Sequence, residues 1–362
     1  MNSSDIARIR LQTQQIANPQ FSSPKDLVGW MGAVQAQDYR MVKWALGVRL
    51  PGSNLETIED AIKDGDIIRT HLLRPTWHIV AANDIRWILD LTAPRIQTAT
   101  RSRHKQLGIT KEVVARSNRA IEEALTDGNH LSRKELVTAL EDAGFENKDN
   151  MASHLLLQAE LDGVICSGAT KGRDYTYALM DERVPDVPKL SREESLAKLA
   201  RTYFRSHGPA TLDDFVWWSG LTLTDSRKAL EMIKPDFQSE AVESREYWFS
   251  ESSVNTADAE KSAFLIPAYD EFLISYKSRN VAISENIEKK AISNNGIFRP
   301  VIVVGGQVVG IWKRSVQKTK VTIETEFFDK PSLDIREQVE ESAGEFARFL
   351  VRETVEVTHH WK

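Results

Sequence analysis

The clearest alternation of apolar and polar positions lies between residues 112 and 182. Apolar residues recur at helical spacing around Ile121, and again around Leu136 after a capping box formed by Ser132 and Glu135. A third helix is expected from about 150 to 162, followed by two strand-like runs, 164–166 and 175–179, on either side of a glycine-containing loop. Three helices followed by a β-hairpin are the pattern of a winged helix, a relative of the helix-turn-helix motif.

Similar patterns occur before and after this unit. On the C-terminal side, we expect helices over 191–206, from Thr211 and from Thr224, and then a strand over 245–249. On the N-terminal side, Ser23 and Pro24 start a helix expected to run to about Gln37. Further elements there are a helix over 55–64, two strands within 67–80 and a long helix over 84–105. We therefore predict three tandem winged-helix units, with boundaries 1–110, 111–184 and 189–256.

The last section, residues 260–362, has a different pattern. Extended runs are expected over 263–266, 272–276 and 321–328, and residues 301–312 form a hairpin around a tight glycine turn. An acidic helix is expected from about 333 to 352. The chain is thus predicted to be an α+β protein that ends in a β-rich domain packed with one helix.

Composition excludes several classes of protein. The 362 residues include one cysteine, Cys166, so neither an internal disulfide nor a four-cysteine zinc site is possible. The chain starts without the apolar core of a signal peptide, and no apolar run approaches the about 20 residues of a membrane span. We therefore expect a cytoplasmic protein that does not enter a membrane.

The net charge of -5 at first disfavours a nucleic-acid partner, but the charge is unevenly distributed. Residues 69–119 contain ten lysines and arginines against three acids, a local charge of +7 that leaves -12 on the rest of the chain. One interpretation is a solvated helix with an excess of arginine. The other is a surface that binds phosphate groups.

A search for catalytic motifs eliminates the common ones. The sequence has no zinc-protease His-Glu-x-x-His, no phosphate-binding loop and no nucleophile elbow. Cys166 falls in an expected core strand, and His71 with His78 lacks a third ligand, so no metal and no cofactor are expected. What remains is the run Gln35-Ala36-Gln37 where a helix was expected to end. From composition alone this run is most simply a polar helix terminus.

Four separated segments resemble the winged-helix proteins related to the bacterial DNA glycosylases AlkZ and YcaQ. They are residues 35–46, which begin with Gln35-Ala36-Gln37; 69–80; 208–220; and 265–273 together with 295–298. The four segments occur in one order and span nearly the whole chain. The resemblance implies three tandem winged helices and a barrel-like C-terminal domain. It also implies a Gln–hydrophobic–Gln catalytic motif, which Gln35 and Gln37 match with the small Ala36 between them.

Glutamine suits one particular glycosidic bond. An amide cannot act as a general base near neutral pH, but it can accept from and donate to a water molecule and so orient it. An N7-alkylated purine is already cationic and leaves readily, so the enzyme mainly has to position the water at C1′. The resemblance therefore implies a monofunctional glycosylase for N7-alkylated purines, with the unhooking of interstrand crosslinks as an extension of the same reaction.

The expected partner is alkylated or crosslinked double-stranded DNA, bound by a monomer. The predicted contacts lie in the basic segment, some on the first wing and the others on the helix that follows it: Arg69, His71, Arg74, Trp77 and His78 on the wing, and Arg95, Arg101, Arg103 and Lys105 on the helix. We expect the acidic C-terminal helix to lie away from the DNA.

Two alternatives remain open at this point. Tandem winged helices also suffice for a non-enzymatic DNA-binding regulator, which would show a sequence preference without releasing any base. They also occur in protein-interaction modules, which would fail to bind any duplex, whatever the salt concentration.

Overall fold

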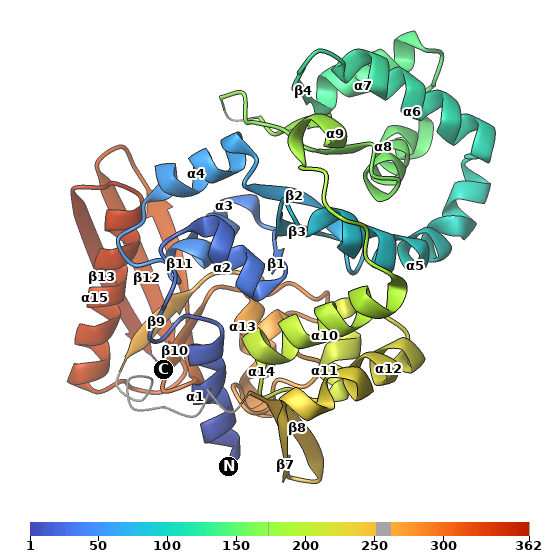
Figure 1. Ribbon diagram of the computed structural model, residues 1–362. Helices are drawn as coiled ribbons and strands as arrows, with labels where there is room; N and C mark the ends of the chain where they lie inside the picture. Colours follow the sequence, from blue (N-terminus) through green and yellow to red (C-terminus); the bar gives the residue numbers. More distant parts are fainter. Residues whose placement is uncertain (173, 251–261, 362) are drawn as a thin grey trace.

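The computed structural model describes residues 1–172, 174–250 and 262–361, in which helices are combined with four small separate sheets (Figure 1). The predicted boundary between the third and fourth units, residues 256–260, lies outside the described residues. Among the described helices, none is both long enough and apolar enough to cross a membrane.

The N-terminal unit has a three-stranded antiparallel sheet in the order β1-β3-β2, surrounded by helices. Its elements in chain order are α1 (Ser3–Thr13), α2 (Pro24–Met31), β1 (Val34–Gln35), α3 (Tyr39–Gly47), α4 (Leu55–Asp64), β2 (Ile67–Leu72), β3 (Thr76–Ala81) and α5 (Ile85–Gln106).

One prediction for this unit was wrong. The helix expected to reach Gln37 ends at Met31, and the next residues form strand β1. Gly32 follows the helix with φ of +77°, a left-handed conformation that glycine adopts without steric cost. Gln35 is therefore the last residue of a strand, and Ala36 and Gln37 lie in the turn between this strand and α3.

The second unit contains the helices and the hairpin that the sequence predicts. Its elements are α6 (Lys111–Leu125), β4 (Leu131–Ser132), α7 (Arg133–Asp142), a 3-10 turn (Lys148–Asn150), α8 (Met151–Leu161), β5 (Ile165–Ser167), β6 (Thr176–Leu179) and the short α9 (Met180–Arg183). The Ser132 side chain and Glu135 form the predicted capping box at the start of α7. Figure 1 shows α6, α7 and α8 as a lobe set apart from the rest of the molecule and reached through α5.

The third unit packs three helices around aromatic side chains. It consists of α10 (Arg192–His207), α11 (Leu212–Ser219), α12 (Leu223–Ile233), a 3-10 turn (Lys234–Asp236) and the hairpin β7 (Gln238–Val242) with β8 (Arg245–Phe249). Tyr203, Phe215 and Trp218 are fully buried in its core. The same hydrophobic cluster extends to α5, so this unit and the first are packed together.

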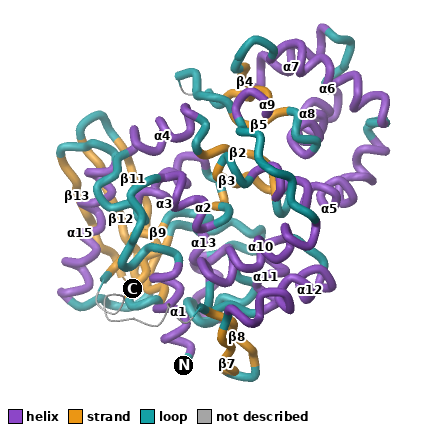
Figure 2. The backbone as a smooth tube through the Cα atoms, in the orientation of Figure 1, coloured by secondary structure: helices purple, strands orange, loops and turns teal. Residues whose placement is uncertain are grey.

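The C-terminal unit has a five-stranded sheet in the order β13-β12-β11-β10-β9. Its elements are β9 (Ala263–Ile266), α13 (Glu271–Ile274), α14 (Glu285–Ala291), β10 (Val301–Val304), β11 (Gln307–Val316), β12 (Lys320–Phe327), α15 (Leu333–Phe349) and β13 (Thr354–Trp361). Helix α15 lies beside the sheet (Figure 2). Its Val339 and Phe346 belong to the same hydrophobic cluster as residues of the strands. Strand β13 then returns parallel to β12.

Two expectations for this unit are corrected. The sheet is open and not barrel-like, because β9 and β13 stand at opposite edges and do not pair with each other. Residues 272–276 were expected to be extended, but α13 covers Glu271–Ile274, with Asp270 capping the Phe272 amide. A short apolar run fits a buried strand and a buried helical turn equally well, so periodicity could not separate the two.

Candidate active site

The first two residues of the Gln35-Ala36-Gln37 motif are held by the neighbouring strands. Gln35 pairs with His78 of β3, and the Ala36 amide donates to the Trp77 carbonyl at 2.7 Å. On the other side, Nη2 of Arg69 donates to the Ala36 carbonyl at 3.1 Å. The strand ends at Gln35, and the chain bends at Gln37 and Asp38 before α3 begins at Tyr39. The motif is therefore a strand end followed by a turn, with its backbone fixed at Gln35 and Ala36.

The two glutamines differ in their surroundings. Gln35 is only 5% exposed, and its Oε1 accepts from Nη2 of Arg74 at 3.3 Å. Gln37 is exposed, and among the described residues its side chain has no hydrogen-bond partner. The first amide is thus oriented by the protein, while the second is available to a substrate or to water.

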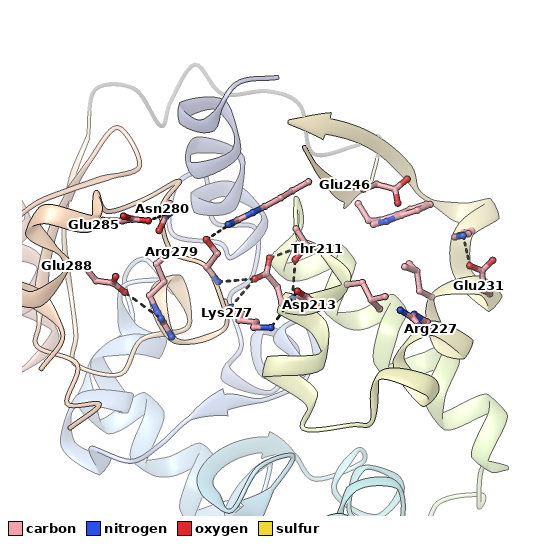
Figure 3. A pocket seen from close by; sticks show the side chains of 17 residues that line it. Thr211, Asp213, Arg227, Glu231, Glu246, Lys277, Arg279, Asn280, Glu285 and Glu288 are labelled. Atoms are coloured by element: carbon pink, nitrogen blue, oxygen red, sulfur yellow. Dashed lines mark hydrogen bonds and ion pairs between the residues drawn. The ribbon is translucent and has the colours of Figure 1, made fainter. Parts of the chain in front are cut away.

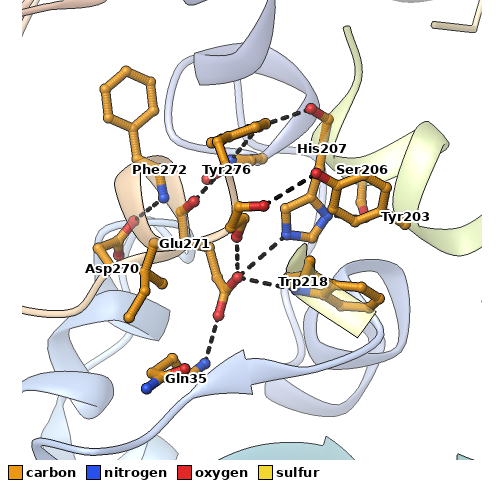
Figure 4. Close-up of polar contacts among 12 residues, drawn as sticks. Gln35, Tyr203, Ser206, His207, Trp218, Asp270, Glu271, Phe272 and Tyr276 are labelled. Carbon is orange, nitrogen blue, oxygen red and sulfur yellow. Dashed lines mark hydrogen bonds and ion pairs between the residues drawn. The ribbon is translucent and has the colours of Figure 1, made fainter. Parts of the chain in front are cut away.

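A buried carboxylate that the sequence reasoning did not single out fixes the backbone of Gln35. Oε1 of Glu271, on α13, accepts from the Gln35 amide at 2.6 Å (Figure 4). Its Oε2 accepts from the Trp218 indole at 3.2 Å and from the Ser275 hydroxyl, and lies 3.5 Å from Nε2 of His207. Glu271 is 1% exposed. The motif in the first unit is therefore tied to the third and C-terminal units through one side chain.

The electrostatics of this cluster favour a charged Glu271. Burial by itself raises the pKa of Glu271, but the nearby His207 imidazole and the hydrogen bond from Ser275 outweigh it and lower the pKa to about 2. Burial also lowers the pKa of His207, which favours a neutral imidazole. Glu271 remains the charged member of the pair, because the Gln35 amide and the Trp218 indole stabilise the carboxylate without titrating.

Helix α13 is anchored by the residue that precedes Glu271. Asp270 accepts two hydrogen bonds, each 2.8 Å long, from the guanidinium of Arg49, which is itself fully buried. Arg49 also donates to Gln14 of the segment after α1. A paired bidentate arginine of this kind fixes both position and orientation. Two adjacent acids inside the otherwise apolar run 265–274 were the available signal, since buried carboxylates require partners.

The structure places the nine predicted DNA-binding residues in three different environments. Arg69 and His78 are 7% and 0% exposed, and His71, Arg74 and Trp77 are partly buried. The other four are exposed on the C-terminal half of α5: Arg95, Arg101, Arg103 and Lys105. Only this last group presents its charges openly to solvent.

His78 is a buried neighbour of the motif. Its Nδ1 lies 3.0 Å from the Thr76 carbonyl, which can only accept, so Nδ1 carries the proton and Nε2 is unprotonated. Burial, with repulsion from Arg74 as the next cause, lowers the pKa of His78 to about 4. The ring is therefore neutral at physiological pH. Among the described residues, no group of three or more histidine, cysteine, aspartate or glutamate side chains is arranged to hold a metal.

A cavity of about 710 Å³ lies between the third unit and the loop after α13 (Figure 3). Six acidic and five basic side chains line it, and several pair with one another. Arg279 lies 3.6 Å from Glu288, and Lys277 lies 3.5 Å from Asp213. Charges balanced in this way give the cavity no net attraction for phosphate groups.

Comparison with known proteins identifies the family of the chain. A model of the family described as AlkZ-like DNA glycosylases matches residues 28–349. The interstrand DNA cross-link repair glycosylase of Streptomyces sahachiroi is 26% identical over 358 residues, which cover 94% of each chain. The solved structure of S. sahachiroi DNA glycosylase AlkZ has the same fold, with a TM-score of 0.80 at 22% identity over 99% of this chain and all of that one. Because the family match spans most of the sequence, the chain belongs to the AlkZ-like DNA glycosylase family.

Proposed function

We propose that this protein is a monofunctional DNA glycosylase that hydrolyses the N-glycosidic bond of N7-alkylated purines in double-stranded DNA and unhooks interstrand crosslinks of the same chemistry. The observation that carries the proposal is the fixed position of Gln35, whose backbone is held by Glu271 and whose side chain is held by Arg74. The crosslink activity is supported by the name of the S. sahachiroi relative.

In this mechanism Gln35 and Gln37 orient one water molecule toward C1′ of the damaged nucleotide. The bond from C1′ to the purine breaks, and its electron pair neutralises the cationic ring. The water oxygen bonds to C1′ and loses a proton to solvent, which leaves an abasic site and a neutral alkylated base. Because the leaving group is already activated, positioning supplies most of the rate, and two amides are sufficient for that.

DNA is proposed to bind along the exposed part of α5. Arg95, Arg101, Arg103 and Lys105 lie there on one continuous helix that joins the first two units. Contacts from these residues to phosphates would set affinity and register without reading the sequence. We further propose that the three helical units are tandem winged helices. The support is the recurrence of helices followed by a two-stranded antiparallel ladder, clearest in β5 with β6 and in β7 with β8.

The direct test is release of a base from duplex DNA. We incubate a duplex containing N7-methylguanine with the wild type, with the double variant Gln35→Ala/Gln37→Ala, and with Gln238→Ala as a control. Gln238 is an exposed glutamine on β7, in the third unit. We expect abasic sites, scored after alkaline cleavage, with the wild type and the control but not with the double variant. Absence of release by the wild type across several N7 adducts would overturn the proposal.

A further inference from the structure

A second cavity, of about 470 Å³, lies between strands β2 and β3 of the first unit and helix α8 with strand β6 of the second. We call it the aromatic pocket because four rings line it: Tyr39, Trp77, Tyr175 and Tyr177. Its volume is within the usual range for small-molecule sites, and such sites often lie between domains. The two units thus form a concave surface lined with rings beside the candidate active site.

The aromatic pocket is linked to the catalytic motif through the side chain of Arg69. The Arg69 guanidinium lies 3.9 Å from the centre of the Trp77 ring, with Tyr39 and Tyr175 also within cation–π range. The same guanidinium donates to the carbonyl of Ala36, between the two glutamines. One side chain therefore contributes to the wall of the pocket and also fixes the motif. The pocket and the motif are thus separated by a single side chain.

A buried acceptor lines the pocket on the α8 side. Glu160 is 1% exposed, and its Oε2 lies 2.6 Å from Nδ1 of His71. Its other oxygen, Oε1, is buried and has no hydrogen-bond partner within the part of the chain that the structure describes. A buried carboxylate oxygen without a donor is costly, so the pocket favours a ligand that brings an N–H group.

The mouth of the pocket carries an exposed ring. Tyr175 is 48% exposed, and its ring packs edge-on against Tyr39, with the centroids 4.5 Å apart. Exposed aromatic side chains beside positive charge are what proteins use to stack bases and other flat rings. The 710 Å³ cavity is different, because it is lined mainly by polar side chains that are largely paired with each other.

We propose that the aromatic pocket binds a planar aromatic group bearing N–H donors, carried by the damaged nucleotide, while the glutamines act on its sugar. This inference rests on the proposed glycosylase function. Two parts of the substrate have this chemistry, namely the alkylated purine itself and an aromatic substituent attached at its N7. The ring stacks on the exposed Tyr175, and an N–H donates to Oε1 of Glu160.

The test compares Tyr175→Ala and Glu160→Gln with the wild type and with Trp361→Ala. Trp361 is a matched control because it is a similarly exposed ring, 40% exposed, in the C-terminal sheet. Three duplexes are used: undamaged, carrying N7-methylguanine, and carrying an N7-guanine adduct with a fused aromatic ring. For each we measure the single-turnover rate of base release and the affinity relative to the undamaged duplex.

We expect Tyr175→Ala to reduce the affinity for the aromatic adduct, relative to the undamaged duplex, about tenfold, as loss of one stacking ring does. Trp361→Ala should leave this preference unchanged. Glu160→Gln should reduce it too, since an amide accepts a hydrogen bond more weakly than a carboxylate. A loss confined to the aromatic adduct assigns the pocket to the substituent, and an equal loss on both lesions assigns it to the purine.

Affinity separates failure of the pocket from failure of the proposed function. If the wild type releases no base but prefers damaged duplex, and Tyr175→Ala abolishes that preference, the pocket stands without the activity. If Tyr175→Ala and Glu160→Gln both retain wild-type rates and preferences, the pocket assignment is overturned. A wild type that does not discriminate damaged from undamaged duplex would also overturn it.

Discussion

The cluster around Glu271 and the exposed half of α5 use charge in opposite ways. In the cluster, the carboxylate is buried and accepts from the backbone of Gln35, from Trp218 and from Ser275. On α5, Arg101 and Lys105 extend into solvent. Burial makes an interaction strong and geometrically fixed, whereas exposure makes it weak and dependent on salt. We assign the first region to positioning and the second to DNA affinity.

The buried region should dominate the dependence of stability on pH. The folded pKa of His78 is about 4, below its ordinary value of 6.5, so between these values the unfolded chain binds a proton that the folded chain does not. The stability that the neutral His78 ring contributes is present above pH 6.5 and is lost as the pH falls toward 4. The free energy of unfolding should fall by about 3 kcal/mol over this range.

Urea unfolding at pH 7.5 and 4.5 tests this assignment with the wild type, His78→Gln and the control His360→Gln. His360 is exposed on β13. The decrease in unfolding free energy should be smaller for His78→Gln than for the wild type, and unchanged for the control. An equal decrease in all three proteins would show that the buried ring does not titrate as described.

The same comparison predicts a rate effect for Glu271→Gln. The amide keeps the shape of the side chain but removes the charge that binds the Gln35 backbone, so the motif should shift slightly. Small misplacements of catalytic groups are costly, and we expect the rate of base release to fall about thirtyfold. DNA affinity should be unchanged, because the cluster is buried. A variant that loses affinity but retains its rate would contradict the positioning role.

On α5 the expected effect is smaller and appears in binding. Arg101→Gln/Arg103→Gln should weaken duplex binding about fivefold and reduce the slope of affinity against salt concentration by about 2, since each phosphate contact contributes about 0.9. The rate of base release by the DNA-bound enzyme should not change. Lys289→Gln/Lys290→Gln, two exposed lysines on α14, is the matched control. An equal slope change in that control would indicate diffuse charge rather than a defined surface.

Local signals explain what the sequence predicted well. The capping boxes at Ser132, Ser191 and Thr211 need only residues three positions apart, and all three begin helices close to where they were expected. Hairpins were found for the same reason, because turn residues and the strands they join are neighbours in the chain.

The features that could not be predicted from the sequence depend on residues that are far apart in the chain. Glu271 acts on Gln35 from 236 residues away, so no local pattern links them. Strand β13 pairs with β12 only after α15 has returned the chain, which left it unpredicted. The end of α2 at Met31 depended on one glycine, and the earlier end of the helix leaves Gln35 in a strand and Gln37 in the turn that follows it.

The central claim is that Gln35 and Gln37 hold one water molecule together. Single-turnover rates of N7-methylguanine release by Gln35→Ala, Gln37→Ala and the double variant test it most directly. Groups that act as a unit are not additive, so we predict a fall of about a hundredfold for each single variant and little further loss in the double. Two losses that simply multiply, or a single variant with the wild-type rate, would contradict the shared water.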